Sequence, residues 1–273
     1  MTSVERGWSD SIDRKAWRFL ARHVTTRPFT LSGPTAVASI TFDDVPDSAA
    51  AVGAPVLKRA GVAGTFYVAA ETCGEVDTHW RVASREQVRD LAAAGHEIGC
   101  HTAPHVNVQS LGAAALAAEC ERSAALLAEI TGARPVNFAY PFGDLGIRQV
   151  RALAGRFHSC RTIYERLNAG TLDLAMVGAI GLFDRTMDRS RLERLIAEAA
   201  ETRGWLVFYT HDVADEPTFM GTSPRLLTET LTLLARHDIP CLTMEDALRH
   251  HGLPGAGREA SRVHGPVVPC AAR

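Results

Sequence analysis

The sequence predicts a single α/β domain built on a parallel sheet. Short apolar runs alternate with helical patterns across residues 36–250, and no polar linker divides them. Chemically reactive side chains follow three of the apolar runs. In parallel α/β folds the carboxyl ends of the strands carry the chemistry, so we expect these side chains to meet in one site.

The bulk properties exclude several classes of protein. A chain of 273 residues is long enough for one large domain with a full core, or for two small ones. Its 46% hydrophobic and 22% charged content is ordinary for a soluble globular protein. A net charge of -2 gives no reason to expect nucleic acid as a partner. The longest apolar stretches are much shorter than a transmembrane segment.

The apolar runs and the periodic patterns give the following elements in chain order. The strand candidates are residues 36–42, 64–69, 97–100, 137–140, 159–163, 205–210 and 240–243, with 176–180 as a weaker one. The helix candidates are residues 49–60, 85–94, 113–130, 191–200, 224–237 and 244–250. Several helices end at or near a glycine, which suits a left-handed helix stop (Gly61, Gly95 and Gly132).

Two segments flank the predicted domain of residues 36–252. Residues 1–35 form an N-terminal extension, in which residues 11–23 have a helical pattern with apolar and basic positions. That helix is expected to cover one end of the domain, and contact with a membrane surface is the alternative. Residues 253–273 are rich in Gly, Pro, Ala and Arg and are expected to form a disordered tail.

The cysteines and the first residues indicate a compartment. The first thirteen residues are polar and lack the apolar core of a secretory signal. The six cysteines are scattered and include no Cys-x-x-Cys pair, so we expect reduced thiols. The predicted location is the cytoplasm.

Three segments at strand ends carry the candidate chemistry. They are Asp43-Asp44, the His-Thr-Ala-Pro-His run of residues 101–105, and His211-Asp212. Two adjacent acids repel each other unless a cation or a proton separates them. One carboxylate and two imidazoles form a ligand set for a divalent ion such as zinc. The other carboxylate could act as a base on a metal-bound water, and a histidine across the site could protonate the leaving group.

Strand alternation separates one cysteine from this set. If His101 points into the site, the preceding residue points away from it, towards the packed helices. We therefore expect Cys100 to be a core thiol and not a fourth ligand.

In these three segments the chain resembles the polysaccharide deacetylases of the NodB-homology type, carbohydrate esterase family 4. Their first motif, Thr-Phe-Asp-Asp-Gly-Pro, is similar to residues 41–46, and their second, His-Ser/Thr-x-x-His, matches residues 101–105. Their last motif, an apolar strand that ends in histidine, is similar to residues 206–211. The resemblance implies a distorted (β/α) barrel with fewer than eight regular repeats.

The resemblance also implies residue roles. A divalent metal, usually Zn²⁺, would be held by Asp44, His101 and His105. Asp43 would be the general base that takes a proton from the metal-bound water, and His211 would be the general acid that protonates the departing amine.

The third motif departs from the family pattern. The family has Arg-Pro-Pro-Tyr-Gly, whereas residues 139–143 read Ala-Tyr-Pro-Phe-Gly. The backbone N–H of Phe142 could still help to stabilise the oxyanion. Ala139 replaces the arginine that orients the base, and our hypothesis is that Arg161, in the next strand candidate, reaches the same place.

Two further departures concern the turn after the acids and the support of His211. Val45 replaces the usual glycine, so we do not expect a glycine-type conformation there. The acidic, tryptophan-bearing motif that tethers the catalytic histidine is not clearly present, and Asp184 and Asp188 are loose candidates for its acid.

The predicted function is therefore hydrolysis of a linear amide C–N bond. The substrate would be an N-acetylated sugar of a polysaccharide or of its lipid-linked precursor, as in exopolysaccharide biosynthesis. One alternative is an amidohydrolase that acts on another small amide, such as a formamido sugar or a cyclic ureide. The other is a glycan-binding module without turnover, which the complete set of acids and histidines argues against.

Overall fold

The computed structural model describes residue 17 and residues 19–253. The strands are β1 (Pro28–Thr30), β2 (Val37–Asp43), β3 (Thr65–Val68), β4 (Glu97–Cys100), β5 (Asn137–Ala139), β6 (Ser159–Arg161), β7 (Thr171–Asp173), β8 (Ile180–Gly181) and β9 (Trp205–Thr210). The helices are α2 (Ala54–Arg59), α3 (Arg85–Ala93), α4 (Ala113–Thr131), α5 (Ile147–Leu153), α6 (Arg189–Thr202), α7 (Pro224–Arg236) and α8 (Met244–His250). A π-helical turn, Ala49–Gly53, leads into α2.

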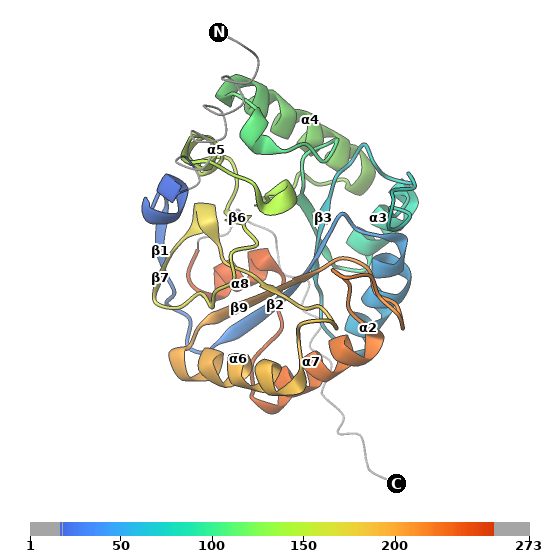
Figure 1. Cartoon of the computed structure of the whole chain (residues 1–273), viewed down its shortest axis with the longest axis vertical. Helices are drawn as coiled ribbons and strands as arrows, with labels where there is room; N and C mark the ends of the chain where they lie inside the picture. The colour runs from blue at the N-terminus through green and yellow to red at the C-terminus, as the bar shows by residue number, and fades with distance from the viewer. Residues whose placement is uncertain (1–16, 18, 254–273) are drawn as a thin grey trace, which may run out of the picture.

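Seven strands form one curled parallel sheet in the order β6-β5-β4-β3-β2-β9-β8. Its two edges approach each other because one segment pairs with both. Val177 forms a parallel bridge with Arg161 at the β6 edge, and Ile180 pairs with Phe208 of β9. Helices surround the strands (Figure 1). The predicted distorted (β/α) barrel with a single domain is confirmed.

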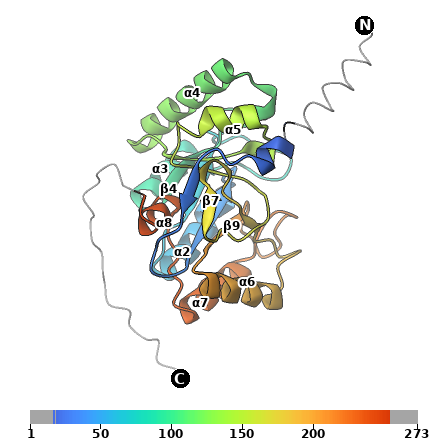
Figure 2. The same ribbon diagram turned by 90° about the vertical axis from the view of Figure 1, so that its left-hand side faces the viewer.

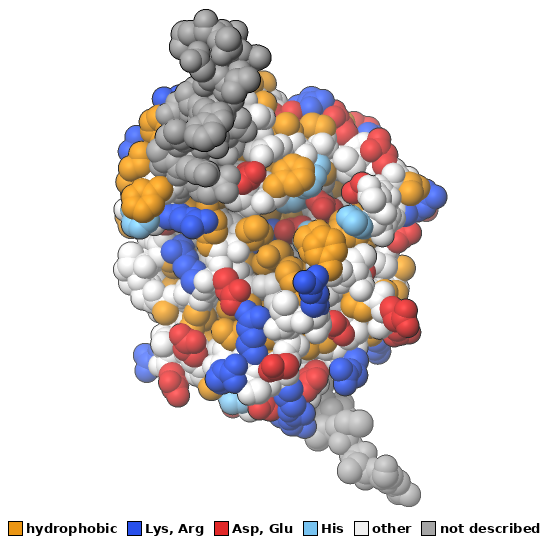
Figure 3. Space-filling view, in the orientation of Figure 1, with side chains coloured by type: hydrophobic (Ala, Val, Ile, Leu, Met, Phe, Trp, Pro, Cys, Tyr) orange, Lys and Arg blue, Asp and Glu red, His pale blue; other side chains and the backbone are white. Residues whose placement is uncertain are grey.

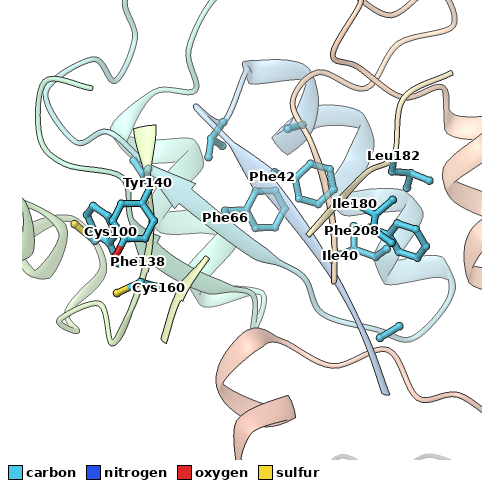
Figure 4. Packing of buried hydrophobic residues seen from close by; sticks show 14 of the residues in the cluster. Ile40, Phe42, Phe66, Cys100, Phe138, Tyr140, Cys160, Ile180, Leu182 and Phe208 are labelled. Carbon is cyan, nitrogen blue, oxygen red and sulfur yellow. The ribbon is translucent and has the colours of Figure 1, made fainter. Parts of the chain in front are cut away.

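Side chains alternate between the outside and the inside of this barrel, as period-two strands require. The outer face packs against the helices in a large apolar core that contains Ile40, Phe42, Phe66 and Phe208 (Figure 4). The inner face belongs to a second cluster, which includes Val37, Tyr67, Ala139 and Trp205.

Helix α8 closes the amino-terminal end of the barrel (Figure 2). The backbone N–H of Met244 donates to Thr65 Oγ1 at 2.9 Å, and that of Glu245 donates to Glu97 Oε2 at 3.0 Å. Thr65 and Glu97 are the first residues of β3 and β4. With this end covered, the carboxyl ends of the strands remain as the open end.

Most of the predicted elements are confirmed to within two residues at each end, with the π-helical turn counted as part of α2. Residues 240–243 are not a strand, because Cys241 alone forms a bridge, to Ala38. The weak candidate 176–180 begins at the end of a short 3₁₀ helix, forms a single bridge at Val177 and reaches β8 only at Ile180. The sequence patterns missed α5. They also missed the antiparallel pair of β1 and β7, because each of these two strands is only three residues long and too short to show a period.

The N-terminal segment is described in part. Residues 17 and 19–23 are helical, and the guanidinium of Arg22 lies 4.1 Å from the centre of the Tyr164 ring. The rest of residues 11–23 and the predicted tail from residue 254 onward lie outside the described residues. The membrane-surface contact stays a prediction. Within the described part of the chain, every helix is too short or too polar to cross a bilayer.

Stability should depend on the protonation of His251, which lies beneath the barrel after α8. Burial, and then the charge of His250, lower the pKa of His251 from 6.5 to about 4. As the pH falls the unfolded chain therefore takes up this proton first. The contribution of neutral His251 to the free energy of unfolding is complete above about pH 6.5 and is lost as the pH falls towards 4.

The variant His251→Asn tests this dependence. Asparagine can keep an acceptor for the N–H of Gly33, which donates to His251 Nδ1 at 3.1 Å. Between pH 7.5 and pH 4.5, the urea-unfolding midpoint should fall less for the variant than for the native chain. An equal fall in both proteins would contradict the assignment.

Candidate active site

The three predicted segments meet at the carboxyl end of the barrel. Asp43 is the last residue of β2, His101 follows β4 directly, and His211 follows β9 directly. These strands lie close together in the sheet order, so their ends bring acids and imidazoles to one place. His101, His211 and Asp43 are all buried.

Asp43 points into the barrel and contacts Arg161. The guanidinium Nη2 of Arg161 donates to Asp43 Oδ1, and both side chains are nearly or fully buried. Arg161 lies directly opposite Ala139 in the β5–β6 register, and residues paired in this way face the same side of a sheet. The arginine absent from position 139 is therefore present one strand further along. Our hypothesis for Arg161 requires a contact with Asp43, and the structure contains that contact.

Two tyrosine rings hold this guanidinium inside the barrel. Its central carbon lies 5.1 Å from the centre of the Tyr67 ring and 5.2 Å from that of Tyr209. Both distances are within the range of a cation–π interaction. A Cβ atom at Gly99 would lie 2.4 Å from the Tyr67 ring, so only glycine lets that ring lie against β4.

Asp44 faces two histidines and not the barrel interior. Its Oδ1 lies 3.4 Å from His101 Nε2 and 3.1 Å from His105 Nε2. His101 Nδ1 lies 2.9 Å from the carbonyl oxygen of Ala139 and must donate to it, which leaves a lone pair on Nε2 of the neutral ring. Asp44 Oδ1 is buried and accepts no backbone or hydroxyl hydrogen bond. Lone pairs thus converge on one point, which fits a cation.

The pKa values of these groups agree with that arrangement. Burial alone would raise the pKa of Asp44, but the hydrogen bond with His101, and the positive charges that His101, His105 and His211 carry when protonated, hold it well below its usual range. Burial and the charge of His101 lower the pKa of His105 to about 4. At neutral pH, Asp44 is therefore ionised and His105 is neutral, the states in which both can bind a metal.

The turn after the acids has an unexpected conformation. Asp44 and Val45 both have positive φ angles, 56° and 48°, although we expected no glycine-type conformation at Val45. That expectation is wrong. The Val45 side chain is fully buried in the core and its carbonyl accepts from the N–H of Ala83, so packing overrides the preference of a β-branched residue. The turn sends Asp43 inward and Asp44 towards the histidines.

His211 lies on the other side of Asp44. Its Nε2 is 3.9 Å from Asp44 Oδ2, and its Nδ1 is 3.3 Å from the carbonyl oxygen of Met220. The ring stacks on Trp80, with centroids 5.4 Å apart. Neither loose candidate for its acidic support has that role. Asp184 accepts from the N–H of Ser223, and Asp188 caps the start of α6.

Two further predicted residues have clear positions. Phe142 has a φ of 59°, and its ring lies 4.4 Å from that of His105, so it borders the group of Asp44, His101 and His105. The expected use of its backbone N–H stays a prediction. Cys100 is buried, donates to Ser123 Oγ at 3.2 Å and points away from the site, which confirms it as a core thiol.

Sequence reasoning missed three side chains that shape the site. Trp80 lies in an irregular loop that gives no periodic signal. Tyr67 and Tyr209 were visible only as members of apolar strands. Their place inside the barrel could have been found from alternation, because each is an even number of residues from the start of a strand whose first residue faces inward.

Removal of one partner of the buried Asp43–Arg161 pair should destabilise the fold. Arg161→Ala leaves an unpaired buried carboxylate, and we expect a loss of about 3–5 kcal/mol in the free energy of unfolding. The double variant Asp43→Asn/Arg161→Ala should recover part of that loss, because no charge remains buried. Urea unfolding measures both. A double variant less stable than Arg161→Ala would argue against the pair.

Known proteins resemble this chain over part of its length. Residues 31–156 match the family model described as polysaccharide deacetylase. A chitin deacetylase from Pestalotiopsis sp is 26% identical over 117 residues, which make up 43% of this chain and only 38% of that protein.

Solved structures share the fold. An acetyl xylan esterase of family 4 from Clostridium thermocellum, in complex with a cobalt ion, has a TM-score of 0.55 at 19% identity, over 80% of this chain and 93% of that one. A family 4 carbohydrate esterase from Streptomyces lividans, in complex with acetate, has a TM-score of 0.53 at 16% identity, over 81% and 98%. The matched family model and the shared barrel confirm the resemblance to the polysaccharide deacetylases of the NodB-homology type, carbohydrate esterase family 4.

Proposed function

We propose that this chain is a metal-dependent deacetylase that removes N-acetyl groups from a sugar of a polysaccharide or of its lipid-linked precursor. The observation that supports the proposal is that the two adjacent acids contact different partners. Asp43 is held by Arg161, and Asp44 faces His101 and His105. One acid is thereby available for a proton and the other for a metal.

The metal set fits a divalent ion, and Zn²⁺ is our first choice for two imidazoles and one carboxylate. The ligands would be Asp44, His101 and His105, whose ligand atoms all lie within 4.8 Å of one another. When bound, the ion would supply Lewis-acid chemistry by polarising the acetyl carbonyl.

The remaining residues would move protons. Asp43 would accept a proton from the water whose oxygen attacks the acetyl carbon. Arg161 would keep its carboxylate in place, and the backbone N–H of Phe142 would donate to the oxyanion. As the C–N bond breaks, His211 would give its proton to the departing nitrogen. The products are acetate and a free amine on the sugar.

Amide specificity, as opposed to ester specificity, is part of the proposal. The structural relatives with a named esterase activity make an acetylated xylan the natural second substrate to test. The lipid-linked precursor and the role in exopolysaccharide biosynthesis also belong to the proposal, and the cytoplasmic location stays a prediction.

The first test combines metal analysis with acetate release from N-acetylglucosamine oligomers. Asp43→Asn should keep the metal and lower kcat by about 10²–10⁴-fold, because it removes only the base. Asp44→Asn should lose the metal as well as the activity. Loss of metal in Asp43→Asn would mean that the two acids have exchanged roles.

Two substrate comparisons belong in the same assay. Acetylated xylan cleaved faster than the amide would overturn the amide assignment. Formate released from formamido sugars faster than acetate from acetamido sugars would favour the small-amide alternative.

The second test concerns Arg161. If it positions Asp43, Arg161→Ala should lower kcat at full metal occupancy with little change in KM. Lysine keeps the charge but lacks the planar fork of the guanidinium, so Arg161→Lys should recover only part of the rate. Unchanged turnover in Arg161→Ala would end this assignment.

A further inference from the structure

A cavity lies between the N-terminal helical segment and the chain that follows β6. Its volume is about 550 Å³, which is within the range of sites that bind small ligands. Its lining residues belong to three stretches of the chain, residues 21–25, 163–166 and 171–176. None of the catalytic or metal-binding residues proposed above lines it, so its contents are not yet explained.

The cavity adjoins the mouth of the barrel. Ile163, which lines it, comes shortly after the end of β6. A Cβ atom at Gly143 would lie 2.3 Å from Ile163 Cγ1, so the isoleucine packs directly on that glycine. Gly143 follows Phe142, whose ring contacts His105. A ligand in the cavity would therefore lie beside the loop that borders the candidate active site.

Two arginines line this cavity without an acidic partner. The guanidinium of Arg22 lies 4.1 Å from the centre of the Tyr164 ring, and Nη2 of Arg166 donates to the carbonyl of Met176. Among the described residues, neither guanidinium forms an ion pair. An arginine has five N–H donors, so most donors of both side chains are available to a ligand.

The backbone makes room for Arg166. A Cβ atom at Gly178 would lie 2.2 Å from Arg166 Cγ and 2.8 Å from its Nε, so a larger residue would displace this side chain. Partial burial lowers the pKa of Arg166, and the charge of Asp173 offsets only part of that effect. An anion beside the guanidinium would compensate for the water that it has lost.

The two acids that line the cavity have other partners. Asp173 accepts three backbone N–H groups, at distances of 2.6–2.9 Å. Glu165 accepts from the guanidinium of Arg191. Because neither acid pairs with Arg22 or Arg166, the cavity presents two guanidiniums to a ligand.

The donors at this cavity fit a phosphate group. A guanidinium binds phosphate oxygens through two parallel hydrogen bonds, which gives both strength and orientation. The hydroxyl of Tyr164 is buried and has no hydrogen-bond partner among the described residues, which is unfavourable for a polar group. Tyr164 lines the same cavity, so a phosphate oxygen drawn to the arginines would bring an acceptor to this wall.

The surface beside the cavity favours a phosphate that is attached to a lipid. Phe19 and Leu20, from the same helical segment as Arg22, have 61% and 40% of their surface accessible. Figure 3 shows hydrophobic and basic side chains next to one another at the left of this face, where Figure 1 has that segment. Apolar side chains beside cations suit the boundary between the acyl chains and the phosphate groups of a membrane.

We propose that this cavity binds a phosphate group through Arg22 and Arg166. The ligand class is a phosphate ester, and a lipid phosphate is its first source. Binding there would hold a lipid-linked sugar beside the mouth of the barrel. The inference goes beyond the proposed function, because phosphate binding at this cavity requires no deacetylation.

Calorimetry with inorganic pyrophosphate and the metal-loaded protein tests the site. Arg22→Gln and Arg166→Gln should each raise the Kd by about 10-fold, the size expected for loss of one hydrogen bond to a charged group. Arg148→Gln is the matched control and should leave the Kd unchanged. Its guanidinium also lies over an aromatic ring, 4.3 Å from the centre of Trp17, but it lines a different cavity. Equal Kd values in all four proteins would overturn the proposal.

Pyrophosphate is also a metal ligand, so the measurement is repeated with Asp44→Asn, which should lack the metal. The Kd should persist in this variant and should still rise when Arg166→Gln is added. Binding that disappears with the metal would place the phosphate on the ion and would overturn the proposal. Failure of the deacetylase proposal would leave these Kd values unchanged, so the two proposals fail separately.

Vesicles distinguish the sources of the phosphate. Co-sedimentation should be measured with phosphatidylcholine vesicles that contain phosphatidic acid, and with phosphatidylcholine alone. Binding only to the first, weakened by Arg166→Gln and by Phe19→Ser, would support a lipid phosphate. Pyrophosphate binding without vesicle binding would support the same site with a soluble phosphate ester as its ligand. Absence of both, or vesicle binding that Arg166→Gln and Arg22→Gln leave unchanged, would overturn the proposal.

Discussion

The arrangement of this site depends on the buried ion pair of Asp43 and Arg161. A carboxylate inside a barrel needs a partner, because an unpaired buried charge is very unfavourable. Arg161 supplies that partner, and its surroundings are adapted to it. Tyr67 and Tyr209 both lie within cation–π distance of the guanidinium, and Gly99 leaves room for Tyr67. Ala139, directly opposite Arg161, adds no side chain that would compete for the space.

The left-handed turn at Asp44 and Val45 then makes two adjacent acids chemically different. In a regular strand, neighbouring side chains point to opposite faces, and the second acid would point into the helical layer. The positive φ angles redirect Asp44 towards His101 and His105 at the mouth of the barrel. The buried valine and the hairpin of residues 75–83 stabilise this strained turn, and the same hairpin brings Trp80 to His211. One loop thus supports both acids and stacks on the histidine opposite them.

The sequence predicted the parts of this arrangement that depend on local pattern. The strands that end in Asp43, His101 and His211 were found because each is a clear apolar run followed by polar residues. The contact of Arg161 with Asp43 could be proposed because a charge was missing at Ala139. The conformation of Val45 could not be predicted, because it depends on packing from distant segments and contradicts the local preference. Trp80 was missed for a similar reason, since a loop without periodicity gives no direction for its side chains.

The closure of the barrel explains why the arginine can lie on β6. This strand is at the edge of the sheet, where it would lack a neighbour on one side. The backbone of Val177 supplies that neighbour, because its N–H donates to the carbonyl of Cys160 and its carbonyl accepts from the N–H of Thr162. These bonds flank Arg161 on both sides and hold its backbone in register with β5. The segment that closes the barrel therefore also fixes the residue that orients Asp43. A loosened closure would therefore reach Asp43 through its guanidinium partner on β6.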